Sequence, residues 1–189
     1  MTLLNRGVAL VTNAAQGPGR AIALRLASEG FKVAVHDSPR NGDQLIEVYR
    51  HIQRLGEHSC VLTADLTMED HVQNLVKDAS NCLGGLNVMI ANTQLCQAAP
   101  ITSTTEEIWN HLFKVNAQSI FWCYKQAAKE MISQGNGGRI IGSCSVWGKQ
   151  GGPSLSAYSA SQFAIRGLTE SAALDLSEHG ITVNAYALR

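Results

Sequence analysis

Short β-prone segments alternate with longer helical segments along the whole chain, and this alternation constrains the fold more than any other feature. The β-prone runs cover residues 8–12, 31–36, 59–63, 86–91, 138–143 and 181–186. Helical periodicity covers the stretch around 22–26 and residues 41–55, 67–83, 104–134 and 156–178. Strands joined by helices need right-handed crossovers, which make the strands parallel. The sequence therefore predicts an α/β fold, a doubly wound parallel sheet of six strands, in a single domain over residues 1–189.

Two of the predicted helices begin with the pattern of a capping box. Thr67 is followed three residues later by Asp70, and Thr104 is followed at the same spacing by Glu107. In a capping box the threonine hydroxyl accepts a hydrogen bond from a free backbone N–H of the first helical turn. We therefore expect Thr67 and Thr104 to be the N-caps of their helices.

The charge balance and hydropathy argue against nucleic-acid and membrane partners. The chain has 15 Lys and Arg against 15 Asp and Glu, so it presents no net charge for nucleic acid or an anionic lipid surface. No apolar run reaches the roughly 18 residues of a membrane span. The first residues lack the basic and apolar regions of a signal peptide. We expect a cytoplasmic protein.

The cysteines are odd in number and far apart, with no C-x-x-C pair and no histidine at metal-ligand spacing. They predict neither a disulfide framework nor a metal site. We expect buried or half-buried reduced thiols. The five are Cys60, Cys82, Cys96, Cys123 and Cys144.

A glycine-rich turn follows the first predicted strand and opens the first helix. Gly17 and Gly19 in this turn would let backbone N–H groups approach a pyrophosphate at the positive end of the helix dipole. The second strand ends in Asp37, a residue type that hydrogen-bonds a ribose 2′-hydroxyl and repels a 2′-phosphate. The alternative is a tight turn with no ligand. The order of the elements favours nucleotide binding.

A second pair of candidate residues is Ser145 and Tyr158, thirteen positions apart, with Asn116 upstream. Ser145 lies just past the expected end of a strand, and Tyr158 lies near the start of a helix. Ligands of open α/β sheets bind at the carboxyl ends of the strands. There a tyrosine can protonate a carbonyl oxygen that a serine hydroxyl polarises. Taken alone, the pair is better explained by a capping serine and a packed tyrosine than by a catalytic site.

Several motifs in the same order make the sequence resemble the short-chain dehydrogenase/reductase family over essentially its whole length. They are Thr12-x-x-x-x-Gly17-x-Gly19, Asp65 in Ala-Asp-Leu, Asn92 after the fourth strand, Asn116 in Lys-Val-Asn, Ser145 in Ser-Cys-Ser-Val, and Tyr158 in Ala-Tyr-Ser-Ala-Ser. The stretches around Tyr158 and around Gly-Ile-Thr-Val-Asn-Ala-Tyr-Ala are most similar to the diacetyl reductase and butanediol dehydrogenase branch.

This resemblance implies a Rossmann fold and hydride transfer between a nicotinamide cofactor, NAD(H) or NADP(H), and a small carbonyl or alcohol. Tyr158 would be the acid/base, Ser145 would orient the substrate, and Asn116 would support a proton relay, with Gln162 in the same catalytic group. It also implies homo-oligomers, here through helices 116–134 and 156–179. The implied cofactor-binding residues are Thr12, Asn13, Gln16, Gly17, Pro18, Gly19, Asp37, Asp65, Leu66, Asn92, Gln94, Tyr158 and Gln162.

Four positions depart from the family pattern. Asn13 replaces the first glycine of the turn; asparagine tolerates a positive φ, but its side chain crowds the phosphate approach. Gln94 stands where the family has the glycine of Asn-Ala-Gly, so we expect it to obstruct the cofactor cleft. The family continues beyond Tyr186 into a substrate-covering segment and a seventh strand. We therefore expect the lid and that strand to be missing, with the sixth strand left as an edge.

The fourth departure is Gln162, which replaces the lysine of Tyr-x-x-x-Lys. The spacing places Gln162 on the helix face of Tyr158. Loss of a cation at ~5 Å removes about 3 kcal/mol of Coulomb stabilisation, which raises the tyrosine pKa by roughly 2. We therefore expect Tyr158 to titrate near the reference value of about 10 and to donate protons better than it accepts them.

The sequence leaves three functions open. The first is an oxidoreductase, with impaired activity, that prefers NAD(H) because of Asp37, although Arg40 could reach a 2′-phosphate. The second is a redox-inactive relative that binds a nucleotide weakly or serves as a subunit. The third is a non-redox cyclase, isomerase or dehydratase that uses Tyr158 as an acid.

Overall fold

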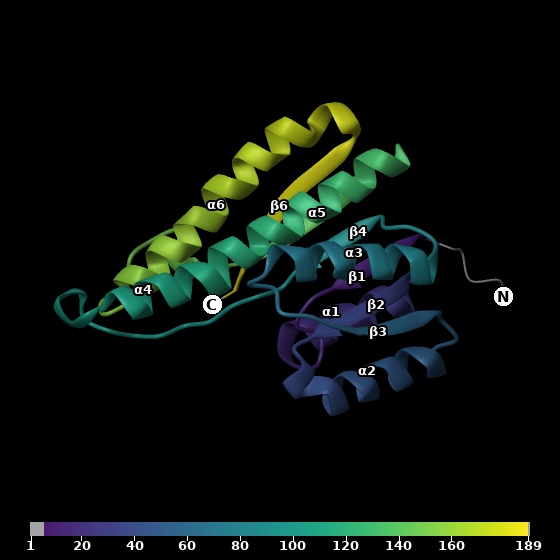
Figure 1. Cartoon of the computed structure of the whole chain (residues 1–189), viewed down its shortest axis with the longest axis horizontal. Coiled ribbons are helices and arrows are strands. Elements are labelled where there is room, and N and C mark those ends of the chain that lie inside the picture. The colour runs from purple at the N-terminus through teal and green to yellow at the C-terminus, as the bar shows by residue number, and fades with distance from the viewer. Residues whose placement is uncertain (1–5, 189) are drawn as a thin grey trace.

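The computed structural model describes residues 6–188. Residues 1–5, on which the signal-peptide expectation depends, and residue 189 lie outside the described residues. Its strands form one parallel sheet in the order β3-β2-β1-β4-β5-β6. The predicted six-stranded doubly wound sheet is confirmed (Figure 1). The strands are β1 (Val8–Val11), β2 (Lys32–Asp37), β3 (Ser59–Thr63), β4 (Val88–Ala91), β5 (Gly138–Ser145) and β6 (Ile181–Leu188).

Helices connect the strands, as the alternation requires. A π-helical turn at Phe113–Gln118 joins α4 to α5, so the long helical segment after β4 is continuous but irregular. The helices are α1 (Gly17–Ser28), α2 (Gly42–Arg54), α3 (Glu69–Leu83), α4 (Glu106–Leu112), α5 (Ser119–Gln134) and α6 (Ser156–Leu176).

The hydrophobic core lies in two layers, one on each face of the sheet. Helices α1 and α2 cover one face through side chains such as Ala23 and Leu45. Helices α3, α5 and α6 cover the other, where Val76, Ile120 and Ile165 are buried (Figure 1). Apolar strands covered on both faces are typical of parallel sheets and explain why β1 and β4 are buried throughout.

Both predicted capping boxes are wrong in detail. The N-cap of α3 is Met68, because the Thr67 hydroxyl and backbone N–H both donate to Asp65 Oδ1, at 2.8 and 2.9 Å. The N-cap of α4 is Thr105, one residue later than predicted, and its hydroxyl accepts a hydrogen bond from the Ile108 N–H at 3.3 Å. At α3 the Asp65 carboxylate binds the Thr67 hydroxyl, and at α4 the hydroxyl of the next threonine, Thr105, is the cap.

Two other expectations about local structure need correction. β5 extends to Ser145 because β6 pairs alongside it as far as Leu188, so Ser145 ends the strand rather than following it. Cys82 and Cys96 are exposed, contrary to the prediction of buried or half-buried thiols. Cys82 lies on α3, and Cys96 lies on the loop after β4. Both side chains are open to solvent there.

The sheet leaves β6 as an edge strand, paired within residues 6–188 only with β5, as expected. Among those residues no helix has the length and apolar character needed to cross a bilayer. Nor does any group of three or more His, Cys, Asp and Glu side chains in that part of the chain have the arrangement to hold a metal ion.

Candidate functional site

The strand order reverses between β1 and β4, and the turns that follow these two strands border one crevice. After β1, Asn13 adopts a φ of 47° and Gly17 a φ of 56°. Gln16 is the N-cap of α1, exposed and without a side-chain cap bond, and Pro18 lies in the first turn. A Cβ at Gly17 would meet no atom within 4 Å, so the backbone at the start of α1 is open to a ligand.

Asp37, at the end of β2, ties this turn in place. One carboxylate oxygen accepts a hydrogen bond from the Ala15 N–H at 3.0 Å. The other accepts from the Ser38 N–H at 2.8 Å and from Asn41 Nδ2 at 2.7 Å. The side chain is 4% exposed, and both oxygens are already engaged within the protein.

The loop after β4 is held by buried side chains from the turn after β1 and from β5. Thr12 Oγ1 accepts a hydrogen bond from the Asn92 N–H at 2.8 Å. Ser143 Oγ accepts from the Thr93 N–H and donates to the Thr93 carbonyl, both at 3.1 Å. These contacts fix the loop at the position where the cleft-lining glycine of the family would lie.

Asn116 holds the same loop one step further on. Its Oδ1 accepts from the Leu95 N–H at 2.7 Å, and its Nδ2 donates to the Leu95 carbonyl at 2.9 Å and to Ser161 Oγ at 3.0 Å. The residue is fully buried in the π-helical turn. Its amide protons are therefore occupied in joining the loop to α6.

A cavity of about 460 Å³ opens beside the turn after β1. Asp65 lies at its rim, and hydrogen bonds from Thr67 hold the pKa of its carboxyl below the usual value. The buried side chain of Leu66 and the side chain of Arg40 also line the cavity. Asp37 does not line this cavity. The cavity is lined by Asn13, His36, Ser38, Pro39, Arg40, Ala64, Asp65, Leu66, Thr67, Thr93 and Val115.

The structure brings Tyr158 and Ser145 together, with Gln94 as a third member. Gln94 Nε2 donates a hydrogen bond to Tyr158 Oη, and Ser145 also hydrogen-bonds that hydroxyl. Burial raises the pKa of Tyr158 above its ordinary value, and the bonds from Ser145 and Gln94 oppose the rise. The sequence predicts a Tyr158 pKa near the reference value, and the structure corrects this prediction upward. The reason is the burial of the side chain, which the sequence alone does not show.

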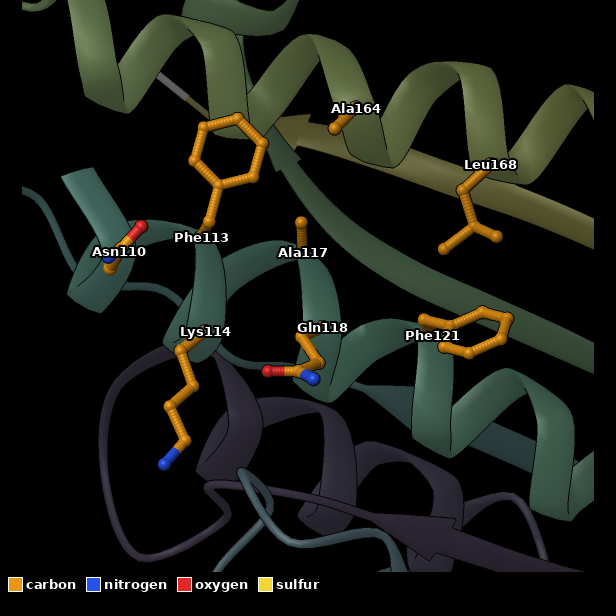
Figure 2. A pocket seen from close by; sticks show the side chains of 8 residues that line it. All are labelled: Asn110, Phe113, Lys114, Ala117, Gln118, Phe121, Ala164 and Leu168. Atoms are coloured by element: carbon orange, nitrogen blue, oxygen red, sulfur yellow. The ribbon is translucent and has the colours of Figure 1, made fainter.

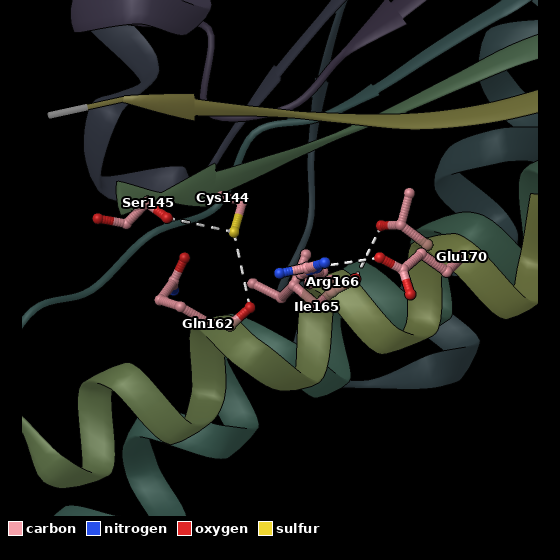
Figure 3. Close-up of polar contacts among 7 residues, drawn as sticks. Cys144, Ser145, Gln162, Ile165, Arg166 and Glu170 are labelled. Carbon is pink, nitrogen blue, oxygen red and sulfur yellow. Dashed lines mark hydrogen bonds and ion pairs between the residues drawn. The ribbon is translucent and has the colours of Figure 1, made fainter. Parts of the chain in front are cut away.

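Gln162 is fully buried, one helical turn after Tyr158, and its side chain turns toward the end of β5 where Ser145 lies (Figure 3). Neither Oε1 nor Nε2 has a hydrogen-bond partner among the described residues. Buried amides are normally paired, so this side chain has unused donors and an unused acceptor beside the Tyr158 site.

Two residues of this region have no clear signal in the sequence. Tyr186, on β6, donates to Asn92 Oδ1 at 2.6 Å, and burial raises its pKa to about 12. His36 is buried next to Asp37, and its Nε2 lies 3.3 Å from the Ala64 carbonyl oxygen. The strand order brings β6 close to the end of β4, and that order is visible only in the structure.

Comparisons with known proteins agree with this arrangement. The chain is 48% identical over 180 residues to a short-chain dehydrogenase/reductase of Armillaria gallica, covering 95% of this chain and 69% of the relative. It is 38% identical to the L-2,3-butanediol dehydrogenase of Corynebacterium glutamicum, covering 95% and 70%. The NAD+-bound crystal structure of a xylitol dehydrogenase matches with a TM-score of 0.91 at 31% identity, covering 99% and 71%.

The family model for short chain dehydrogenases matches residues 7–188, which is nearly the whole chain. The fold, the crevice at the reversal of strand order and the extent of this match all lead to one assignment. This chain belongs to the short-chain dehydrogenase family of oxidoreductases.

Proposed function

We propose that the protein is an NAD(P)(H)-dependent oxidoreductase that reduces a small carbonyl compound or oxidises the matching alcohol. The observation that carries this proposal is the Tyr158 hydroxyl, which lies beside Ser145 at the carboxyl end of the sheet. A phenol and a serine hydroxyl at one point can protonate and polarise a carbonyl oxygen. We propose further that residues 1–189 act as one dinucleotide-binding unit.

The residues of the crevice fit a dinucleotide. The open backbone at Gly17 and the helix start behind it suit a pyrophosphate, with Asn13, Gln16, Pro18 and Gly19 around it. The cavity at Asp65 and Leu66 suits the adenosine half. The remaining cofactor contacts would come from Thr12, Asp37, Asn92, Gln94, Tyr158 and Gln162.

The unpaired amide of Gln162 supports the same assignment. A ribose hydroxyl group offers both a donor and an acceptor, which are the partners that Oε1 and Nε2 lack. When bound, the nicotinamide supplies the hydride. Tyr158 would give its proton to the carbonyl oxygen, Ser145 would donate a hydrogen bond to that oxygen, and Asn116 would keep the loop after β4 in register.

Asp37 supports a preference for NAD(H) over NADP(H). The negative charge of a buried carboxylate at the end of β2 would oppose the binding of a 2′-phosphate. Arg40 is the counter-argument, because it lines the cavity and could pair with a phosphate.

Two observations favour a second candidate, a redox-inactive relative. The Gln94 side chain hydrogen-bonds the Tyr158 hydroxyl and so occupies one side of it. The buried Gln162 side chain is uncharged and does not help the phenolate to form. Weak nucleotide binding without turnover would follow from both. A non-redox enzyme that uses Tyr158 as an acid would show neither cofactor binding nor hydride transfer.

Titration with NADH and NADPH, followed by nicotinamide fluorescence, tests the proposal. We expect NADH to bind more tightly than NADPH and diketones to be reduced with oxidation of NADH. Tyr158→Phe should still bind the cofactor through its other contacts and lose the reduction. Equal or tighter NADPH binding contradicts the preference, and binding without turnover by the wild type selects the redox-inactive relative.

We also propose a homo-oligomer through the α5 and α6 side of the molecule. A groove of about 610 Å³ lies between the segment from α4 to α5 and the helix α6 (Figure 2). Phe113 and Phe121 face Ala164 and Leu168 across it, and Phe121 remains 40% exposed. Exposed aromatic side chains in an apolar groove are typical of protein interfaces. Sedimentation velocity of the purified chain tests this proposal.

A further inference from the structure

Gln94 reaches Tyr158 from a loop whose neighbouring positions are held by hydrogen bonds to buried side chains. The backbones of Asn92, Thr93 and Leu95 are hydrogen-bonded to the buried side chains of Thr12, Ser143 and Asn116. Gln94 itself has an exposed side chain, and its Nε2 donates to Tyr158 Oη. The loop therefore presents this one amide to the phenol oxygen from a preorganised backbone.

The direction of this hydrogen bond leaves the phenol proton free. An amide nitrogen is only a donor, so Tyr158 Oη must be the acceptor. Ser145 Oγ accepts from the Trp147 N–H at 3.3 Å, which leaves the serine proton available to a second oxygen. A hydroxyl that accepts one hydrogen bond becomes a better donor in another.

We propose that Gln94 is a positioning residue that orients the Tyr158 hydroxyl and stabilises the phenolate formed when its proton is transferred. This inference rests on the proposed function. In the reduction, a bound nicotinamide would supply the hydride to the carbonyl carbon by giving up its own C–H bond and so becoming oxidised. The Tyr158 O–H bond breaks as the O–H bond of the new alcohol forms. The negative charge stays on Oη, where Gln94 Nε2 donates to it, until water returns the proton.

The hydrogen bond from Gln94 matters because the Tyr158 side chain is buried among apolar residues. Tyr158 is 3% exposed and packs with Leu112, Leu155 and Trp147, so few waters can solvate a phenolate. Negative charge on the sulfur of Cys96 or Cys144 would oppose the ionisation of Tyr158. The positive charges of Lys149 and Arg166 lower the pKa of Cys144, although burial raises it more. Gln162 faces the site from α6 and is uncharged.

A titration of Tyr158 in the protein without cofactor tests the inference independently of turnover. We would replace the tyrosines with 3,5-difluorotyrosine, whose fluorines acidify the phenol, and follow the fluorine NMR signal against pH. Tyr158→Phe assigns the signal among the four tyrosines. Gln94→Leu removes the donor at similar size, and Gln97→Leu is the matched control on the same exposed loop.

We expect Gln94→Leu to raise the titration midpoint of Tyr158 by about 1 to 2 pH units, the effect of one hydrogen bond to a charged oxygen. Gln94→Glu should raise it further, and Gln97→Leu should leave it unchanged. An unchanged midpoint in Gln94→Leu, or an equal rise in the control, overturns the inference. A raised midpoint in a protein that never oxidises NADH would keep this inference and reject the proposed function.

Discussion

At the scale of single residues, Gln162 is buried without hydrogen bonds to its side chain from any other described residue. Its side chain is fully buried, and neither polar atom has a partner among the described residues. A buried amide without hydrogen bonds destabilises the folded state by about 1 to 3 kcal/mol. Such a position is expected where a ligand, rather than the protein, completes the hydrogen bonds.

Gln162→Met should therefore stabilise the protein without cofactor by about 1 to 3 kcal/mol, because methionine fills a similar volume and has no unpaired polar atoms. Urea unfolding of both proteins measures the difference. Gln126→Met is the matched control: Gln126 is also buried, but its Nε2 donates to Glu69 Oε1 at 2.9 Å, so its replacement should destabilise. A loss of stability in Gln162→Met would mean that the amide has partners in solution.

Gln162→Lys should raise the rate of alcohol oxidation relative to the wild type. Oxidation needs the Tyr158 phenolate, and a cation nearby stabilises that charge by up to about 3 kcal/mol, or roughly a hundredfold in rate. The pH–rate profile of each variant is the measurement. In the Tyr158→Phe background the lysine should bring no gain. If Gln162→Lys gains nothing and Tyr158→Phe loses nothing, Tyr158 is only a packed side chain.

At the scale of the elements, the crevice depends on how closely α1 approaches the loop after β4. Gly19, in the first turn of α1, is buried against this loop. A Cβ there would overlap the Asn13 carbonyl oxygen and the Asn92 side-chain amide. Asn92 Nδ2 also donates to the Asn13 carbonyl, at 3.4 Å. The turn, the helix and the loop are therefore in close contact with one another.

Gly19→Ala should destabilise the protein by about 1 to 3 kcal/mol, because the added methyl group must displace backbone atoms. The cofactor crevice should be distorted at the same time, with weaker NADH binding. Gly167→Ala provides the control, since a Cβ at Gly167 in the interior of α6 meets no atom within 4 Å. That variant should be more stable by about 0.5 to 1 kcal/mol, as alanine favours a helix. Thermal unfolding and NADH titration of both variants test the pair, and equal stability of the two would contradict the close approach.

At the scale of the whole molecule, the sheet buries a histidine whose titration links folding to pH. His36 is 1% exposed, and burial lowers its pKa from 6.5 to about 4, although the Ala64 carbonyl and Asp37 oppose this change. Between these two values the unfolded chain binds a proton that the folded protein does not bind. The free energy of unfolding therefore decreases as the pH falls from 6.5 toward 4.

Between pH 7 and pH 5 we expect His36 to remove about 2 kcal/mol from the free energy of unfolding. Urea unfolding at both pH values measures the loss. His36→Gln should lose less stability over this range than the wild type. His179→Gln, a change at a side chain that is 39% exposed, should keep the full loss. Equal losses in the wild type and His36→Gln would show that His36 is charged or solvated in the folded protein.

The sequence determined the elements and their order. Alternating β-prone and helical segments predict the six strands, because a parallel strand covered on both faces must be apolar and must be followed by a crossover. The positive φ of Asn13 and the helix start at Gly17 follow from local backbone preferences. The sequence also predicts that Ser145 and Tyr158 share one edge of the sheet. Ser145 lies at the carboxyl end of a strand, and Tyr158 lies near the start of the following helix.

Only the tertiary structure decided which side chains contact one another at that edge. Gln94 reaches Tyr158 because loops after β1, β4 and β5 converge, and no local pattern encodes a hydrogen bond between residues 64 positions apart. The rise in the Tyr158 pKa and the unpaired amide of Gln162 both come from burial, which depends on packing across the whole sheet. Sequence periodicity fixes which face of an element is apolar, whereas solvation and partners are properties of the assembled fold.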